Sequence, residues 1–196
     1  MKSNIKRIVD NSLNNEHNFD NCIVEEGSQK VYDIVLAAVK KTGTNSNPVF
    51  IYGGNNSKLT YLVQEIENYL VNNSNKKLLY VTGKDFIADY KKANNSQNNS
   101  DVNYRTFRSK YTKIDVLIID GIQCLGTQSK AQEEFFNIFN SLWRNGKKII
   151  ITSNVPLDDL NSFENRLLTR FNWGTKIAIN ELINKAESNS TSVSIE

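Results

Sequence analysis

The sequence predicts an α/β domain in which a mostly parallel β-sheet lies between two layers of helices. Two observations support this fold class. Short apolar runs alternate along the chain with segments whose apolar residues recur at helical spacing. The runs are apolar throughout instead of alternating with polar residues, which is typical of strands that are buried on both faces of a parallel sheet.

Five apolar runs are predicted to form the strands. They comprise residues 49–52, 78–81, 116–119, 149–151 and 176–179. Other segments carry apolar residues three or four positions apart, which predicts amphipathic helices over residues 31–39, 62–70 and 135–143. Thr82 is followed three residues later by Asp85, so we expect a capping box to open a fourth helix that continues through Tyr90.

The chain has 196 residues, of which 39% are hydrophobic, enough for one domain with a substantial core. We expect this core domain over residues 18–186, between a polar segment at 1–17 and a Ser-rich segment at 187–196 that are both flexible. The net charge of +3 is too small to indicate a nucleic-acid-coating protein by itself.

Composition also argues against membrane and zinc-binding classes. No segment has the apolar length of a membrane span, and the first residues contain no apolar signal-peptide core. Cys22 and Cys124 lie far apart, and with a single histidine, His17, they provide no zinc-ligand spacing. We therefore expect a reduced cytoplasmic protein that does not contact a membrane.

The turn after the first predicted strand partly matches a phosphate-binding loop of the form G-x-x-x-x-G-K-S/T. Gly53, with Gly54 beside it, and Thr60 fit the pattern, but Lys58 replaces the second glycine and Leu59 replaces the lysine. The lysine normally neutralises phosphate charge, which a leucine cannot do. Two alternatives stay open: an ordinary Gly-rich turn, or a one-residue register slip that brings Lys58 into the lysine's role.

Two polar residues end neighbouring strands at the edge where ligands of parallel sheets bind. Asp120 follows an apolar strand, the form of a Walker B segment whose carboxylate holds Mg²⁺, but Gly121 occupies the position of a second acid. Asn154 ends the next strand and has an amide that can reach a γ-phosphate or its attacking water. Asp120 can equally well cap the turn that follows its strand, and for Asn154 taken alone turn formation is the more common role.

Arg166 and Arg170 are four residues apart, so they share one helix face, near Phe171 and Trp173, which we expect to be buried. Arginines in this position commonly form surface ion pairs. An arginine held at a helix end can also reach the phosphates of a neighbouring subunit, as an arginine finger does.

Taken in order, these elements resemble the AAA+ domain of the bacterial replication initiator DnaA over roughly residues 18–180. The phrases that carry the resemblance are residues 18–21, 47–54, 80–82, 115–123, 132–137 and 165–174. The resemblance implies a three-layer αβα P-loop NTPase core with a five-stranded parallel sheet. In the family, a helical lid follows this core, and we expect it to be lacking here.

The resemblance also implies roles for individual residues. Thr60 and Asp120 match the Mg²⁺-binding threonine and the Walker B aspartate, and they would hold the metal only if nucleotide binds. Asn154 matches the sensor-1 position. Arg170 matches the arginine finger, and Arg166 a second arginine of the same motif.

A further set of basic residues matches positions concerned with single-stranded DNA. Lys130 falls at a basic position that looks like one the family uses for this ligand, and residues 101–113 correspond to its helical insertion. This stretch interleaves aromatic residues with Arg105, Arg108, Lys110 and Lys113, a combination suited to stacked bases and a phosphate backbone. The alternative is a helix that packs its aromatic residues and exposes its charges.

The departures from the family pattern are asymmetric. Lys58, Leu59 and Gly121 alter the residues that bind ATP within one chain, and Glu25 stands near a small-residue position of the adenine pocket. The arginines that would contact ATP on a neighbour are retained.

These features lead to the hypothesis of a non-hydrolysing subunit without its own ATP or Mg²⁺. It would dock on ATP-bound DnaA or a related AAA+ partner during replication initiation or its regulation. The alternatives are a weak ATP-binding switch or ATPase, a single-stranded DNA-binding protein of replication, and a decayed paralogue that retains only the fold.

Overall fold

The computed structural model describes residues 26–54, 56–94 and 100–180. The predictions for residues 1–17, 187–196 and Glu25 lie outside the described residues. None of the helices in the described part is long and apolar enough to cross a membrane.

Five parallel strands form one sheet, as predicted. They are β1 (Val49–Tyr52), β2 (Leu78–Thr82), β3 (Val116–Asp120), β4 (Lys148–Ser153) and β5 (Thr175–Ala178). Their order in the sheet is β2-β3-β4-β1-β5, and every pair of neighbours is parallel. The last strand begins and ends one residue earlier than the sequence pattern predicts.

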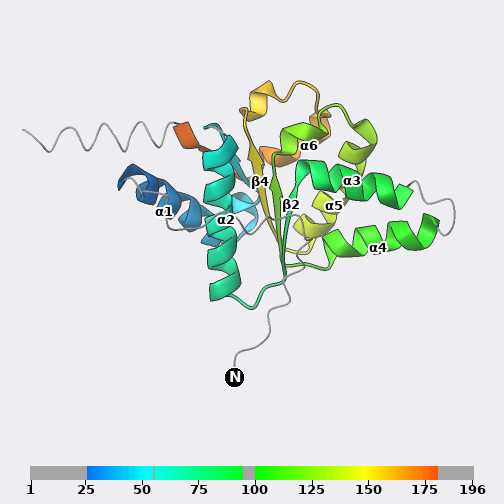
Figure 1. Ribbon diagram of the computed structural model, residues 1–196, viewed down its shortest axis with the longest axis horizontal. Coiled ribbons are helices and arrows are strands. Elements are labelled where there is room, and N and C mark those ends of the chain that lie inside the picture. The colour runs from blue at the N-terminus through cyan, green and yellow to red at the C-terminus, as the bar shows by residue number, and fades with distance from the viewer. Residues whose placement is uncertain (1–25, 55, 95–99, 181–196) are drawn as a thin grey trace, which may run out of the picture.

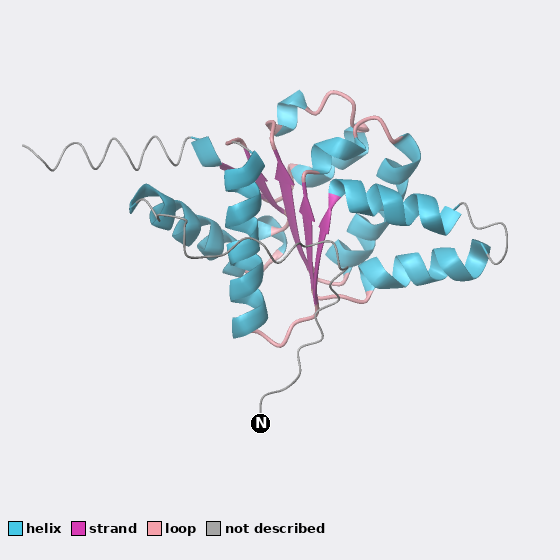
Figure 2. Ribbon diagram, viewed as in Figure 1, coloured by secondary structure: helices cyan, strands magenta, loops and turns pink. Residues whose placement is uncertain are grey.

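Helices cover both faces of the sheet (Figures 1 and 2). Two helices cover one face, α1 (Glu26–Lys40) and α2 (Asn56–Asn73). The other face carries α3 (Gly83–Asn94), α4 (Ser100–Thr112), α5 (Ser129–Arg144) and α6 (Asn165–Phe171). Short 3-10 helices lie at Thr44–Ser46, Ile122–Leu125 and Leu157–Asp159.

Successive residues of the central strands point into two separate cores. Val49 and Ile51 of β1 pack with buried residues of α1 and α2, whereas Phe50 between them packs with residues of α3 to α6. All three side chains are fully buried. Burial on both faces is the reason why the strands are continuously apolar in sequence.

The predicted capping box begins α3. The backbone N–H of Asp85 donates to the Thr82 Oγ1 at 3.1 Å, and the Thr82 hydroxyl donates to the Asp85 Oδ2 at 2.6 Å. The helix continues past Tyr90 to Asn94, because the following turn still places a buried side chain, Ala93, against the core.

Two segments that carry the family resemblance, residues 47–54 and 165–174, contact the end of the sheet where the strands begin. The Asn47 Nδ2 donates to the Lys147 carbonyl oxygen at 2.8 Å, and the Asn47 Oδ1 accepts from the Ile149 N–H at 2.9 Å. A Cβ atom on Gly174 would lie 1.8 Å from the Pro48 carbonyl oxygen, so only glycine fits.

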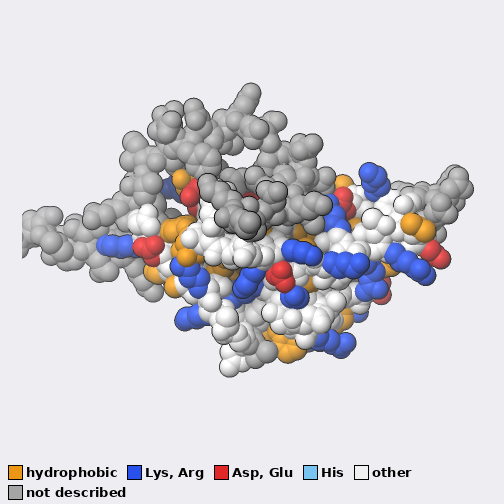
Figure 3. Space-filling model, turned by 90° about the horizontal axis from the view of Figure 1, so that it is seen from below, with side chains coloured by type: hydrophobic (Ala, Val, Ile, Leu, Met, Phe, Trp, Pro, Cys, Tyr) orange, Lys and Arg blue, Asp and Glu red, His pale blue; other side chains and the backbone are white. Residues whose placement is uncertain are grey.

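Lysine and arginine side chains lie across this end of the molecule (Figure 3). Lys148 at the start of β4 donates to the carbonyl oxygens of Ala38, Lys41 and Ser46 and so fastens the end of α1 to the sheet. Burial, followed by the charge of Lys76, lowers the pKa of Lys148 to about 8. These lysines lie at the edge opposite the candidate site.

Candidate functional site

The loop after β1 meets the ends of β3 and β4 at the carboxyl edge of the sheet. The Gly53 N–H donates to the Ser153 carbonyl oxygen at 3.2 Å. Gly53 and Gly54 have φ angles of 84° and 78°, a left-handed conformation that favours glycine. The backbone therefore turns sharply at the point where a phosphate-binding loop would begin.

The Asp120 carboxylate accepts hydrogen bonds from three hydroxyl groups. Its Oδ2 accepts from the Thr60 Oγ1 at 2.9 Å and from the Tyr80 hydroxyl at 2.7 Å. Its Oδ1 accepts from the Thr152 Oγ1 at 2.5 Å. We call Asp120 and these three residues the hydroxyl cage. It joins α2, β2, β3 and β4.

Sequence reasoning paired Thr60 with Asp120 but missed Tyr80 and Thr152. Burial, followed by the charge of Asp120, raises the pKa of Tyr80 far above the ordinary tyrosine value. The phenol therefore keeps its proton across the physiological range and donates it to the carboxylate. The signal available in the sequence was a tyrosine with a polar hydroxyl inside an otherwise apolar strand.

Leu59, at the position of the phosphate-binding lysine, has its side chain in the core. It is 3% exposed and belongs to the cluster that includes Val31 of α1 and Ile177 of β5. Lys58 next to it is exposed. An aliphatic side chain thus packs against the sheet where an ammonium group would have to face phosphate.

The ends of β3 and β4 carry no further acid close to Asp120 in sequence. Gly121 adopts a φ of 73°, and its N–H donates to the Thr152 Oγ1 at 2.8 Å. Asn154 is exposed, and its backbone N–H donates to the Gln123 Oε1 at 3.4 Å. Among the described residues at this edge, Leu59 and Gly121 thus stand where the motif has its lysine and its second acid, and three hydroxyl groups bond to the Asp120 carboxylate.

The two predicted finger residues lie on α6 and stack on aromatic rings. The Arg170 guanidinium lies 3.9 Å from the Trp173 ring centroid, and its Nε donates to the Asn140 Oδ1 at 3.0 Å. The Arg166 guanidinium lies 4.5 Å from the Phe136 ring centroid and pairs with Glu164 at 2.5 Å. We call Arg166, Arg170, Phe136 and Trp173 the arginine cluster.

The predicted burial is confirmed for Phe171 but is wrong for Trp173, which is 39% exposed. Trp173 lies beyond the end of α6, where its ring contacts Trp143, at 4.8 Å between centroids, and Arg170. An exposed tryptophan beside arginines is typical of a surface used in recognition.

A buried glutamine connects the segment after Asp120 to the arginine helix. The Gln132 Nε2 donates to the carbonyl oxygens of Leu125, Gly126 and Ser162, and its Oε1 accepts from the Glu164 N–H at 2.9 Å. Gln132 is 1% exposed, and these bonds use all the polar atoms of its amide. The position of α6 therefore depends on a residue to which sequence reasoning gave no role.

The candidate DNA-binding residues fall into two groups. Arg108 pairs with buried Glu134 at 3.0 Å, and Lys110 pairs with Asp89 at 2.7 Å, so these two cations have partners within the chain. Arg105 on α4 and Lys130 at the start of α5 are exposed. The aromatic residues of α4 pack inward, and the most buried of them are Phe107 and Tyr111.

Residues 13–178 match the family model described as the bacterial DnaA ATPase domain. The chain belongs to the bacterial DnaA ATPase-domain family. It is 37% identical over 174 residues to the chromosomal replication initiator protein DnaA of Streptococcus mutans, an alignment that covers 87% of this chain and 37% of the relative. The chain thus spans less than half the length of the DnaA proteins it matches.

Solved structures of DnaA have the same fold. Domain III of the Thermotoga maritima DnaA is 31% identical with a TM-score of 0.68, over 92% of this chain and 76% of that one. A replication initiator DnaA bound to AMPPCP and single-stranded DNA is 30% identical with a TM-score of 0.69, over 85% of this chain and 50% of that one.

The hydroxyl cage leads to a stability prediction. Replacing Tyr80 by phenylalanine keeps the ring but removes one donor to the Asp120 carboxylate, so we expect a loss of about 2 kcal/mol in the free energy of unfolding. Urea denaturation at pH 7 measures it. Tyr69→Phe is the matched control, because the Tyr69 hydroxyl does not contact Asp120 and its loss should cost under about 0.5 kcal/mol.

A comparison of wild type with Tyr80→Phe at different pH values also tests the pKa of Tyr80. Its folded-state pKa lies above the unfolded value, so its contribution is complete below pH 10 and is lost as the pH rises further. The stability difference between wild type and Tyr80→Phe should therefore shrink above about pH 10. Equal stability losses for Tyr80→Phe and Tyr69→Phe at pH 7 would contradict the role given to the cage.

Proposed function

We propose that this chain is a DnaA-like core that neither binds nor hydrolyses ATP itself and docks through Arg170 and Arg166 on ATP held by a DnaA or related AAA+ partner. In that role it takes part in the initiation of DNA replication or in its regulation. The observation that carries the proposal is the burial of Leu59, which leaves the lysine position of the loop without a charge.

The hydroxyl cage supports the first half of the proposal. A Walker B aspartate that serves Mg²⁺ holds the metal's water molecules with its carboxylate oxygens. Here the hydroxyls of Thr60, Tyr80 and Thr152 occupy the Asp120 carboxylate. Three of the roughly four lone-pair sites of the carboxylate are thus used within the chain, and leucine stands at the loop position whose lysine would fix the phosphates.

The arginine cluster supports the second half. Asn140 and Trp173 hold Arg170 from two sides, which limits the side-chain entropy that binding would otherwise cost. A guanidinium has five N–H donors, and Asn140 uses only the Nε, so the terminal nitrogens can still approach an anion. The relatives named replication initiator DnaA supply the class of partner.

Nucleotide binding is the first test. A fluorescent ATP analogue titrated with the protein in Mg²⁺ should show no saturable rise in anisotropy up to millimolar concentrations, because the loop lacks its cation. Lys58→Ala should give the same flat titration. Saturable micromolar binding that Lys58→Ala abolishes would instead favour the ATP-binding switch.

Partner docking is the second test. We expect the full chain to bind ATP-loaded, full-length S. mutans DnaA more tightly than ADP-loaded DnaA in biolayer interferometry. Arg170→Ala should weaken binding to the ATP form by about 10- to 100-fold, the usual range for a charge-assisted hydrogen bond to phosphate. The exposed cation Lys91 on α3 provides the control, Lys91→Ala, which should bind within about twofold of wild type.

The same assay with DnaA of Lachnoclostridium phytofermentans, a 38% identical relative, tests whether binding depends on the species from which the DnaA partner comes. Absence of nucleotide-dependent binding to both proteins, or an unchanged affinity of Arg170→Ala, would end the docking proposal.

Single-stranded DNA binding is a second candidate function. It is favoured by the exposure of Arg105 and Lys130, neither of which forms an ion pair within the described part of the chain. Affinity for a fluorescent oligonucleotide should then fall steeply with salt, and Lys130→Ala should reduce both the affinity and the salt dependence. Salt-independent binding, or none, would remove this candidate.

A further inference from the structure

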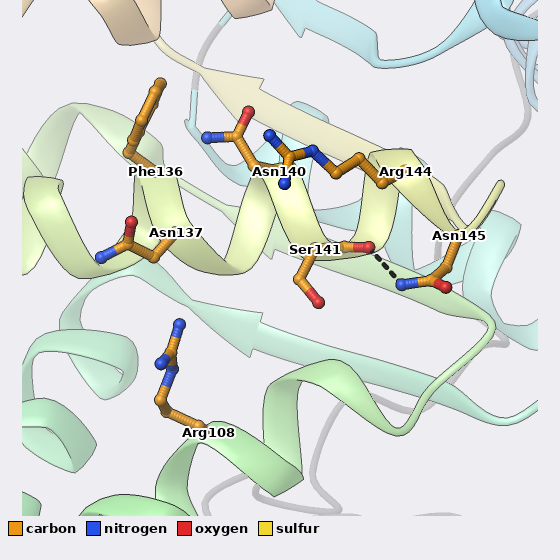
Figure 4. Close-up of a pocket in the computed structure, with 7 residues that line it drawn as sticks. All are labelled: Arg108, Phe136, Asn137, Asn140, Ser141, Arg144 and Asn145. Atoms are coloured by element: carbon orange, nitrogen blue, oxygen red, sulfur yellow. Dashed lines mark hydrogen bonds between the residues drawn. The ribbon is translucent and has the colours of Figure 1, made fainter.

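A polar hollow lies beside the arginine cluster on the outer face of α5 (Figure 4). It has a volume of about 550 Å³ and is lined by five residues of α5, by Asn145 directly after the helix, and by Arg108 of α4. Figure 4 shows Arg108 reaching from α4 toward Asn137, while Arg144 lies back along α5 toward Asn140. The hollow is therefore a groove along α5, with α4 as one wall.

The groove and the arginine cluster form one surface. Phe136 lines the groove and also lies under the guanidinium groups of Arg166 and Arg170. Asn140 lines the groove and accepts the hydrogen bond from Arg170. A partner that reaches Arg170 from outside therefore lies directly against the groove.

The charge of this surface is positive on balance. None of the described residues that line the groove is acidic. Arg108 is paired with Glu134, whose side chain is 4% exposed and lies below the surface, and Arg166 is paired with Glu164. Arg144 is exposed, and neither it nor Arg170 forms an ion pair with any residue that the structure describes.

We propose that this groove receives an acidic segment of the ATP-bound partner, with a carboxylate of that segment paired with Arg144. The inference rests on the proposed function and extends it, because it assigns the partner a second contact besides its nucleotide. Arg144 lies seven residues after Asn137, about 10 Å along the helix, so a short extended or helical segment can cover the groove.

The composition of the surface favours a protein over a nucleic acid. Its cations are all arginines, and an exposed tryptophan, Trp173, adjoins them. Arginine and tryptophan are enriched in the cores of protein interfaces, where lysine is depleted, whereas nucleic-acid surfaces use both cations. The amides of Asn137, Asn140 and Asn145 can bond to peptide groups of an incoming chain.

Charge reversal at Arg144 tests the inference. With ATP-loaded S. mutans DnaA as the binding partner, Arg144→Glu should weaken binding by about tenfold or more, and Arg144→Ala by less. Arg144→Lys should fall between Arg144→Ala and wild type, because the charge remains without the planar fork. Lys91→Glu changes the charge equally on another face and should bind within about twofold of wild type.

The outcomes separate this inference from the proposed function. If Arg170→Ala weakens binding but Arg144→Glu and Arg144→Ala do not, the docking proposal stands and the groove has no role in it. If wild type binds neither DnaA protein, the docking proposal fails and the inference falls with it. If Arg144→Glu lowers affinity for a single-stranded oligonucleotide and leaves DnaA binding unchanged, the groove binds nucleic acid and the inference is overturned.

Discussion

The Asp120 carboxylate at the end of β3 is the point where the elements around the candidate site meet. Its hydrogen bonds join the first turns of α2 to β2 and β4 through three hydroxyl groups. In a parallel α/β sheet, this edge is normally completed by a ligand. Here the chain itself supplies three hydroxyl donors to the carboxylate, and Leu59, one residue before Thr60, packs into the core.

The loop after β1 and helix α6 therefore carry different groups. The loop after β1 presents a buried leucine where phosphate would need a charge, whereas α6 presents guanidinium groups held by aromatic rings and by Asn140. Gln132 connects these regions, since it bonds both to the segment after Asp120 and to the start of α6. Under the proposed function, α6 would keep its arginines in a defined position even though the loop after β1 has no charge at its lysine position.

The sequence was sufficient for the strands, the main helices and the capping box of α3, because each rests on a local pattern of apolar or hydrogen-bonding residues. It was sufficient to place Thr60 beside Asp120, since both belong to motifs with known positions in the fold. The burial expected for Trp173 was wrong, because proximity to a helix in sequence does not show which side of a ring the fold covers.

Other features could not be predicted from the sequence because their partners are distant along the chain. The Tyr80 hydroxyl bonds to a carboxylate 40 residues away, and Gln132 bonds to a carbonyl 30 residues away. The sequence pattern assigned Arg108 to DNA binding, whereas the fold pairs it with buried Glu134. Local patterns report which residues are polar, but only the tertiary structure shows which of them already have partners.

The stoichiometry of the complex with ATP-loaded S. mutans DnaA tests this asymmetry most directly. Mass photometry at increasing excess of the chain would measure it. The account predicts that each DnaA molecule takes up one copy and that further excess adds none, because a docked copy offers no nucleotide to the arginines of the next. Complexes that keep growing with excess chain would show that copies receive one another, and this would contradict the account.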